Sequence, residues 1–473
     1  MSERVGDVLR DKGIADQGRD SVGFLLGCAI AALTLGRAIQ VAEGHFAPEA
    51  IAWLAVSLLV LGVAVLFPGP VERFGDRPLW VILGVGLAAQ FAQLVTTVPA
   101  IYLTEATAAE LDAFGWVMAG TAIVSLGAIF GARSLARILF PLLIVIYLLA
   151  GVWIIRSSPD PPIDVHVVHQ DSIDALVAGR NPYEITFPNI YGHERFYGPG
   201  MVQDGRVQFG FQYPPLSLLL SAPGKLVAGD FRYAHLVAGA IAGALIAGAR
   251  PGRVATAAAT LFLFTPRTFF IIEQGWTEPL MLMLLAAVSF AAVRRWAFSP
   301  YMAGALVASK QYAVWFLPLV VLLRRTTSMR EAVKELARAL GVALAVTLPF
   351  FLWGPRAFLY DLFTVQARLP FREEGLTFLS LWSRLTGDVP PSWIGWLIAA
   401  GAVALVLLRA PRTASGFGAG GALVLALFFA FNRSAFANYY YFVLGSLWIA
   451  VAAGSVASPR ARSQSGLRLD QAT

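Results

Sequence analysis

The chain has 473 residues, 57% of them hydrophobic, and its 44 glycines raise the apolar share to about two-thirds, against roughly 45–50% in soluble proteins. Charged residues make up only 14%, too few to cover the surface of a soluble protein. The net charge of +7 does not indicate a nucleic-acid partner, because in a membrane protein the distribution of charge matters more than its sum. Cys28 is the only cysteine, which excludes an internal disulfide and a thiolate metal cluster. Soluble, disordered and disulfide-rich secreted proteins are thereby excluded, and we expect an all-α polytopic membrane protein.

Apolar segments long enough to cross the hydrocarbon, which takes roughly 20 residues, recur along the whole chain. The predicted spans are residues 21–42, 49–67, 79–98, 113–131, 138–156, 213–228, 232–249, 254–272, 277–293, 300–323, 339–353, 392–409, 415–431 and 436–456. Residues 213–249 and 300–323 do not fit an alternation of inner and outer loops, so we expect short or broken helices there. The total is about 11–14 transmembrane helices.

The distribution of basic residues predicts which loops face the cytoplasm. Arg73 and Arg77 lie in one early turn and Arg133 and Arg137 in another, whereas residues 99–112 between them carry acidic residues and no Lys or Arg. Later basic residues, including the run from 324 to 338, fit the same alternation. The resulting scheme is a multi-pass protein of the bacterial plasma membrane, with cytoplasmic termini, a cytoplasmic tail at 457–473 and two outer loops at 157–212 and 354–391.

Polar and aromatic clusters gather at the outer ends of the spans in this scheme. They include residues 273–278, 353–391 and 432–440 as well as the first outer loop. Ionisable groups at membrane depth are expensive and usually functional. Their shared face predicts one functional site on the outer side.

The first outer loop begins with prolines that stiffen the exit from the membrane, followed by Asp164. Asp164 stands where a helix N-cap belongs and Gly179 stands at a helix stop, which predicts a short amphipathic helix lying on the membrane. At 100° per residue, Asp164, Val168, Asp171 and Ala175 share one face, and Ile173 and Leu176 lie on another. Asp164 is either an N-cap or a catalytic base, and the two roles do not exclude each other.

The residues that follow are aromatic and polar. Arg180, Asn181, Tyr183 and Tyr213 suit a carbohydrate, whose hydroxyls need directional partners and whose C–H faces stack on rings. The same residues suit an aromatic belt at the headgroup level. Lys310 is harder to explain as a surface residue, because a charge within an apolar segment requires a partner or water.

These residues occur in an order that resembles the glycosyltransferases of the C superfamily (GT-C fold), in particular the family 87 polyprenyl-phosphate-mannose-dependent mannosyltransferases. The resemblance spans residues 138–456, whereas residues 1–137 depart from the compact family pattern and have no predicted chemical role. The matching motifs are Asp164, Ala178-Gly179-Arg180-Asn181-Pro182-Tyr183, Tyr213-Pro214-Pro215-Leu216, Glu273-Gln274-Gly275-Trp276-Thr277-Glu278-Pro279, Ser309-Lys310-Gln311-Tyr312 and the run from Phe431 to Tyr440.

The resemblance implies a GT-C-like helical bundle and an inverting transferase of cell-envelope glycolipid biosynthesis. Its donor would be a polyprenyl-phosphate-linked sugar and its acceptor a lipid or glycan on the outer face, with mannose, arabinose and other sugars left open. Asp164 would be the general base, with Asp171 as the fallback and Glu278 as a weaker one. A raised pKa, expected for a carboxylate near a low-dielectric boundary, would make Asp164 a better base. The candidate substrate-binding residues are His166, His169, Arg180, Asn181, Tyr183, Tyr213, Glu273, Gln274, Trp276, Glu278, Lys310, Gln311, Arg368, Arg372, Asn432, Arg433, Asn438 and Tyr439.

The donor phosphate would need cationic partners, for which Lys310, Arg368, Arg372 and Arg433 are the candidates. We predict no cofactor, and no His/Asp/Glu cluster with ligand spacing supports a divalent cation. The alternative function is a transporter or flippase of lipid-linked glycan precursors, because broken helices and a mid-membrane Lys310 also fit that class. Such a transporter typically has related halves, and no internal repeat is visible here, which favours the enzyme.

Overall fold

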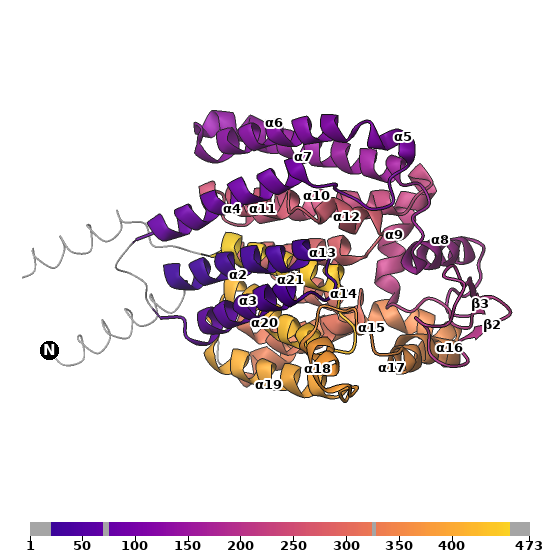
Figure 1. Cartoon of the computed structure of the whole chain (residues 1–473). Coiled ribbons are helices and arrows are strands. Elements are labelled where there is room, and N and C mark those ends of the chain that lie inside the picture. Colours follow the sequence, from indigo (N-terminus) through magenta and orange to yellow (C-terminus); the bar gives the residue numbers. More distant parts are fainter. Residues whose placement is uncertain (1–19, 70–74, 324–327, 455–473) are drawn as a thin grey trace, which may run out of the picture.

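The computed structural model describes residues 20–69, 75–323 and 328–454 (Figure 1). Predictions that concern Arg73, the first residues of the basic run 324–338 and the tail 457–473 lie outside the described residues. Within the described ranges the chain is helical apart from three two-residue strands. The all-α prediction is therefore confirmed.

Seven helices of the described chain are long and apolar enough to cross a membrane: α2 (Val22–Val41), α3 (Pro48–Leu66), α4 (Arg77–Thr96), α6 (Leu111–Phe130), α7 (Arg133–Ser157), α10 (Arg232–Ala249) and α15 (Met329–Trp353). Shorter apolar helices accompany them: α9 (Pro215–Ala228), α11 (Arg253–Leu263), α13 (Glu278–Val293), α19 (Ile394–Arg409), α20 (Ala414–Ala430) and α21 (Ala437–Ala453). Hydrophobic length alone was enough to find these segments, and the protein is a multi-pass membrane protein.

The predicted break in residues 300–323 is confirmed. This segment consists of α14 (Ser299–Val307) and two 3₁₀ helices, η2 (Gln311–Phe316) and η3 (Pro318–Leu323). The Ala308 carbonyl at the break accepts a hydrogen bond from the Leu216 amide in the first turn of α9, at 3.1 Å. These two backbone groups have no partner within their own helices, and they bond each other instead. Inside a membrane no water is present to bond them, so such a partner within the protein is needed.

The expectation of one continuous span at 254–272 is wrong. The chain leaves α11 at Leu263 and resumes as the short α12 (Thr268–Glu273), with Pro266 in the gap. A second break follows at Gly275, whose φ of +69° lies in the left-handed region. A Cβ at Gly275 would lie 2.7 Å from the Phe231 ring, so both the turn and the packing require glycine here.

The N-terminal helices belong to the same core as the C-terminal ones. Helices α2 and α3 pack against each other, and they also contact α21 and α20 respectively (Figure 1). A Cβ at Gly27 of α2 would lie 2.5 Å from the Ala64 methyl group of α3, so the two helices approach closely. One hydrophobic cluster contains buried residues from Phe24 to Ala452. It therefore includes helices on both sides of residue 137, where the resemblance described above begins.

The two predicted outer loops lie together at one end of the bundle (Figure 1). The first contains the helix α8 (Asp164–Val177) and the strands β1 (Phe187–Pro188), β2 (Val202–Gln203) and β3 (Arg206–Val207). The strands form an antiparallel sheet in the order β1-β3-β2. The second contains α16 (Pro355–Leu359), the π-helix η4 (Tyr360–Thr364), α17 (Val365–Arg368) and α18 (Phe378–Thr386). A further short helix, α5 (Glu105–Ala108), precedes α6. The loop end is therefore built from short elements that the ends of the long helices hold in place.

The predicted helix after the membrane exit is confirmed as α8, and it ends as expected. Gly179 has a φ of +70°, its amide bonds the Leu176 carbonyl, and the Arg180 amide bonds the Ala175 carbonyl at 2.8 Å. This pair of bonds is a Schellman motif. Val168 and Ala175, from the face predicted to carry Asp164, are buried, as is Ile173 from the other face, and α8 packs on α9 and β1.

Candidate functional site

Asp164 is the first residue inside α8, and the prediction that it is the N-cap is wrong, since Ile163 holds that position. Its Oδ1 accepts a hydrogen bond from the adjacent Val165 amide at 2.8 Å, and its own amide donates to the Tyr191 hydroxyl at 3.2 Å. Burial raises the pKa of Asp164, and the Val165 amide and the charge of Arg372 only partly oppose this. A half-buried carboxylate with a raised pKa is suited to accept a proton.

A small hollow lies beside Asp164, between α8 and the three-stranded sheet. It spans about 240 Å³ between its lining atoms, a figure that includes space open to solvent. The hollow leaves room for about one water molecule next to the carboxylate. Its lining residues are Asp164, Val167, Val168, Phe187, Pro188, Tyr197, Val207 and Phe209.

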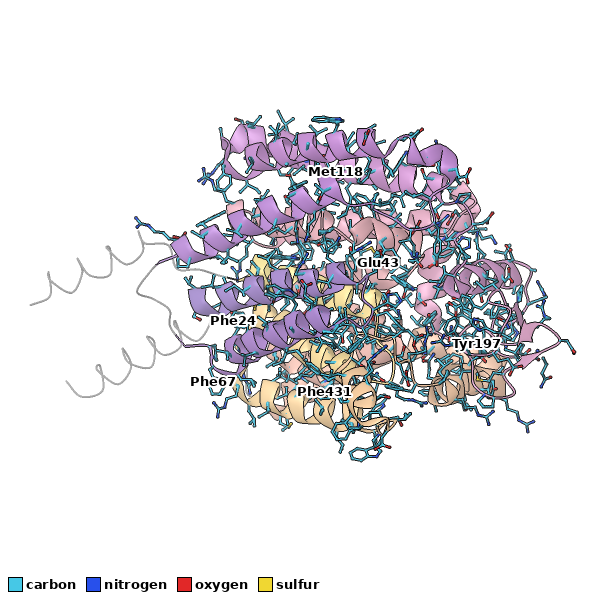
Figure 2. All side chains as sticks on the ribbon, in the orientation of Figure 1. Phe24, Glu43, Phe67, Met118, Tyr197 and Phe431 are labelled. Carbon is cyan, nitrogen blue, oxygen red and sulfur yellow. The ribbon has the colours of Figure 1, made fainter. Side chains whose placement is uncertain are left out.

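Arg372 is the cation whose charge acts on Asp164. Its guanidinium lies 4.2 Å from the centroid of the Phe196 ring and 5.0 Å from that of Phe436, and its Nε donates to Glu374 at 2.6 Å. Phe196 belongs to the first outer loop and Arg372 to the second, so this contact joins the two loops. Phe436, the other ring that Arg372 contacts, is the N-cap of α21. Tyr197, next to Phe196, lies at the same end of the bundle (Figure 2).

A buried ion pair lies in the same part of the molecule. Lys310 Nζ donates to Glu278 Oε1 at 2.5 Å, and both side chains are almost inaccessible. The Tyr312 hydroxyl and the Asn438 amide also donate to Glu278 Oε1, each at 3.0 Å. Glu278 Oε2 is buried with no hydrogen-bond partner among the described residues. The pair joins the start of α13, the break before η2 and the start of α21, which are distant in the sequence.

Tyrosine rings surround the Lys310 ammonium and connect it to the Asp164 region. Its Nζ lies 5.1 Å from the Tyr213 ring centroid, 5.5 Å from that of Tyr312 and 5.7 Å from that of Tyr439. Burial raises the pKa of Tyr213, and the nearby Tyr439 and the charges of Asp164 and Glu278 raise it further. Tyr213 is thus within electrostatic reach of both carboxylates. The structure brings these predicted residues together.

Gln311 lies at the same junction. Its Nε2 donates to the Gln212 carbonyl at 2.5 Å, which holds the residue before Tyr213 against the break that precedes η2. The Gln366 side chain donates to the Gln212 side chain at 3.4 Å from the second outer loop. The predicted Gln311 therefore contacts backbone that positions Tyr213.

His166 and His169 are buried on the side of α8 that packs on the bundle, and they do not line the hollow. The His169 ring stacks on Phe231 at 4.9 Å, and its Nδ1 contacts the Val165 carbonyl at 3.0 Å. Burial lowers the pKa of His169 to about 3 and that of His166 to about 4, so both imidazoles are neutral near pH 7. They fix α8 in place, and through it the position of Asp164.

Asp171 lies two turns along α8 and also does not line the hollow. Its charged neighbours are Asp174, Lys225 and Arg206. Burial is the main cause that raises the pKa of Asp171, and the negative charge of Asp174 raises it further. Lys225 is already paired with Asp174 at 2.6 Å. The structure thus separates the fallback base from the Asp164 region.

Three predicted site residues of the 273–278 segment, Glu273, Gln274 and Trp276, make structural contacts within the protein. The Glu273 carboxylate accepts from the Ile101 amide at 2.8 Å and from the Tyr102 amide at 2.7 Å. Gln274 donates to Glu273 at 3.2 Å, and Trp276 packs against the hydrophobic core. These contacts anchor the segment before α5 and do not reach the Asp164 hollow.

The remaining predicted residues have local partners. The Arg433 guanidinium donates to the Ala367 carbonyl at 3.0 Å, and the Asn432 side chain accepts from the Arg433 amide at 2.7 Å. Arg368 is exposed, 5.9 Å from the Tyr360 ring centroid. Three others lie just after α8: Arg180 is exposed, the Asn181 side chain accepts from the Tyr183 amide at 3.0 Å, and the Tyr183 hydroxyl donates to the Tyr213 carbonyl at 2.8 Å.

Sequence reasoning missed Arg232, Tyr191, Phe196, Tyr197 and Asp361. Arg232 is fully buried and donates to the Asp230 carboxylate and to the Ser158, Pro159 and Glu273 carbonyls, which fixes the exit of α7 just before Asp164. An arginine at the start of an apolar span was a signal that could have found it. The other four lie in loops without a local pattern.

No group of three or more His, Cys, Asp or Glu side chains within the described ranges is arranged to hold a metal ion. The fold and the site define a multi-pass helical membrane protein with a carboxylate, a cation and clustered tyrosines at one end of its bundle.

No protein-family model matches the chain, and no curated protein matches it. Among solved structures it is similar to the crystal structure of ArnT from Cupriavidus metallidurans bound to undecaprenyl phosphate. The TM-score is 0.42 and the identity 17%, over 70% of this chain and 62% of ArnT, so the match spans less than two-thirds of ArnT. A TM-score of this size does not establish a common fold, and membership of the GT-C superfamily stays a prediction.

Proposed function

We propose that this protein is a GT-C-type membrane glycosyltransferase that moves a sugar from a polyprenyl-phosphate-linked donor to a lipid or glycan hydroxyl on the outer face. The observation that carries this proposal is the position of Asp164, a half-buried carboxylate beside a small hollow with the charge of Arg372 close to it. The motif order described above supports the class of reaction.

In the proposed reaction Asp164 removes the proton from the acceptor hydroxyl while that oxygen bonds to the anomeric carbon of the donor. The bond between the anomeric carbon and the phosphate oxygen breaks, and the lipid monophosphate leaves with the bonding electrons. One displacement of this kind inverts the anomeric configuration. The raised pKa of Asp164 makes it a stronger base than an exposed carboxylate.

Arg372 is the best-supported partner for the leaving phosphate. Lys310 and Arg372 are both ion-paired, with Glu278 and Glu374 respectively, but the Lys310 pair is almost inaccessible, whereas a quarter of the Arg372 side chain is exposed and can meet an anion. The Arg372 guanidinium bonds Glu374 through Nε, and its planar group is suited to contact a phosphate with its two terminal nitrogens. In this assignment Lys310 organises the tyrosine rings.

The direct test is sugar transfer by the purified protein in liposomes. Polyprenyl-phosphate hexoses and pentoses with labelled sugars are offered in turn, with a membrane lipid extract as the acceptor. Label that moves to the extract from one donor supports the proposal and names the sugar. A transporter is the alternative, favoured by the buried Lys310–Glu278 pair at helix breaks. Movement of an intact donor across the bilayer without transfer would favour it and contradict the enzyme.

Replacing Arg372 tests the phosphate assignment. We expect Arg372→Gln to lower kcat/KM for the donor by about 10²-fold, the usual effect of removing one donor to a developing oxyanion. Arg384→Gln is the matched control, because Arg384 is an exposed arginine of the same loop that also lies over a phenyl ring, 4.4 Å from the Phe46 centroid. Steady-state kinetics at varied donor concentration measures both variants, and equal losses would refute the assignment.

A further inference from the structure

Asp361 is a buried carboxylate that links the two outer loops. It lies in the π-helix η4 and is 1% exposed. Its Oδ2 accepts a hydrogen bond from the Gly210 amide at 3.1 Å, across 151 residues of sequence. One-turn π-helices often occur at functional sites.

The Gly210 backbone lies close to both the Tyr183 carbonyl and the Asp361 carboxyl group. A Cβ at Gly210 would lie 2.6 Å from the Tyr183 carbonyl oxygen and 2.7 Å from Asp361 Oδ2. Contacts that short do not occur, so only glycine brings the backbone this near to the carboxyl group. The bond therefore fixes the path of residues 209–213.

These residues carry three features of the proposed site. Phe209 lines the hollow beside Asp164. The Gln212 carbonyl accepts from Gln311 at 2.5 Å. The Tyr213 ring lies 5.1 Å from Lys310 Nζ. A shift of Gly210 would move one wall of the hollow and the ring that lies between Asp164 and Lys310.

We propose that Asp361 is a positioning residue for sugar transfer, and that its bond to Gly210 holds residues 209–213 in the arrangement the reaction needs. Because this inference rests on the proposed transfer reaction, its test includes a measurement that does not depend on transfer. Asp361 is not one of the residues that line the hollow, and it acts through Gly210.

The surroundings of Asp361 favour the neutral acid. Burial raises the pKa of Asp361 to about 8, and the Gly210 amide is the group that lowers it. The titratable group that faces it is the Tyr183 phenol, from the segment after α8, whose pKa the Asp361 charge raises further. The Tyr183 ring belongs to a buried apolar cluster with Phe350 of α15 and Phe358 of α16. Above about pH 8 the carboxyl group ionises. The carboxylate is a stronger acceptor for the Gly210 amide, but burying its charge in this apolar setting is costly, and that cost destabilises the folded junction.

Activity against pH gives the first readout. We expect wild-type kcat/KM to fall above about pH 8, and Asp361→Asn, which keeps an acceptor for Gly210 but cannot ionise, to lack that fall while keeping most of the activity at pH 7. Asp361→Leu removes the acceptor and should lose about 100-fold at every pH, the usual effect of a misplacement near 1 Å. Gly210→Ala, which displaces the same segment from the other side, should lose a similar factor.

Asp388→Asn is the matched control, because Asp388 is an exposed carboxylate of the same loop and should follow the wild type. Either an alkaline fall in Asp361→Asn equal to that of the wild type, or full activity in both Asp361→Leu and Gly210→Ala, would overturn the inference.

The melting temperature in detergent gives the second readout. A carboxyl group with a raised folded-state pKa contributes stability that is complete below the unfolded value and is lost as the pH rises to the folded value. The wild type should therefore lose melting temperature between about pH 4 and pH 8 more steeply than Asp361→Asn. Identical slopes would overturn the neutral-acid assignment. If the slopes differ but the wild type transfers no sugar, the proposed function fails and the state of Asp361 stands.

Discussion

Replacing Asp164 with asparagine is expected to lower sugar transfer by about 10²–10⁴-fold, the usual contribution of a positioned general base. The amide has nearly the same shape and can still accept the Val165 amide bond, so the fold should persist while the base is lost. Asp171→Asn is the matched control on the same helix, and we expect it to transfer at close to the wild-type rate, because Asp171 does not line the hollow. Initial rates with saturating donor measure both.

The pH profile adds a second measurement to this prediction. Asp164 must be ionised to act as a base, so wild-type transfer should fall as the pH drops through its pKa. Burial raises that pKa, so the fall should come at a higher pH than the ordinary aspartate value of 3.8. A larger loss in Asp171→Asn than in Asp164→Asn would assign the base to Asp171 and contradict the role of Asp164.

Replacing Glu278 with leucine is expected to lower the free energy of unfolding by about 3–5 kcal/mol, because it leaves Lys310 buried without a counter-charge. The Tyr312 and Asn438 donors would lose their acceptor as well. The double variant Glu278→Leu with Lys310→Met removes both charges and should recover most of the lost stability. Thermal unfolding in detergent, followed by circular dichroism, measures the wild type, the single variants and the double variant.

The exposed pair Lys334–Glu331 of α15 is the matched control for this cycle. Its side chains are 46% and 43% accessible, and solvent-exposed pairs are worth roughly 0–1 kcal/mol, so Glu331→Leu should change stability little. If the double variant is as unstable as Glu278→Leu alone, charge burial is not the cause, and loss of the Tyr312 and Asn438 bonds explains the effect.

The sequence alone determined the local features of this protein. The spans at 21–42 and 138–156 correspond to α2 and α7, because hydrophobic length is a property of consecutive residues. The start of α8 and its stop at Gly179 were readable because prolines and glycine restrict or permit backbone angles locally. The broken helix at 300–323 followed from the alternation of charged loops, which can be followed along the sequence without knowing any contact between helices.

Only the tertiary structure decided which polar groups meet. The polar pattern of residues 273–278 did not distinguish the roles of its two glutamates. Glu273 binds the Ile101 and Tyr102 amides. Glu278 instead forms an ion pair with Lys310. Asp361 had no local signal, because its burial and its bond to Gly210 depend on the packing of two loops 151 residues apart. A hydrogen bond or an ion pair needs two partners within a few ångströms, and nothing in the residues near one partner specifies the other. Hydrophobic length fixes where a chain crosses the membrane, and helix packing then selects the charged residues that share a site.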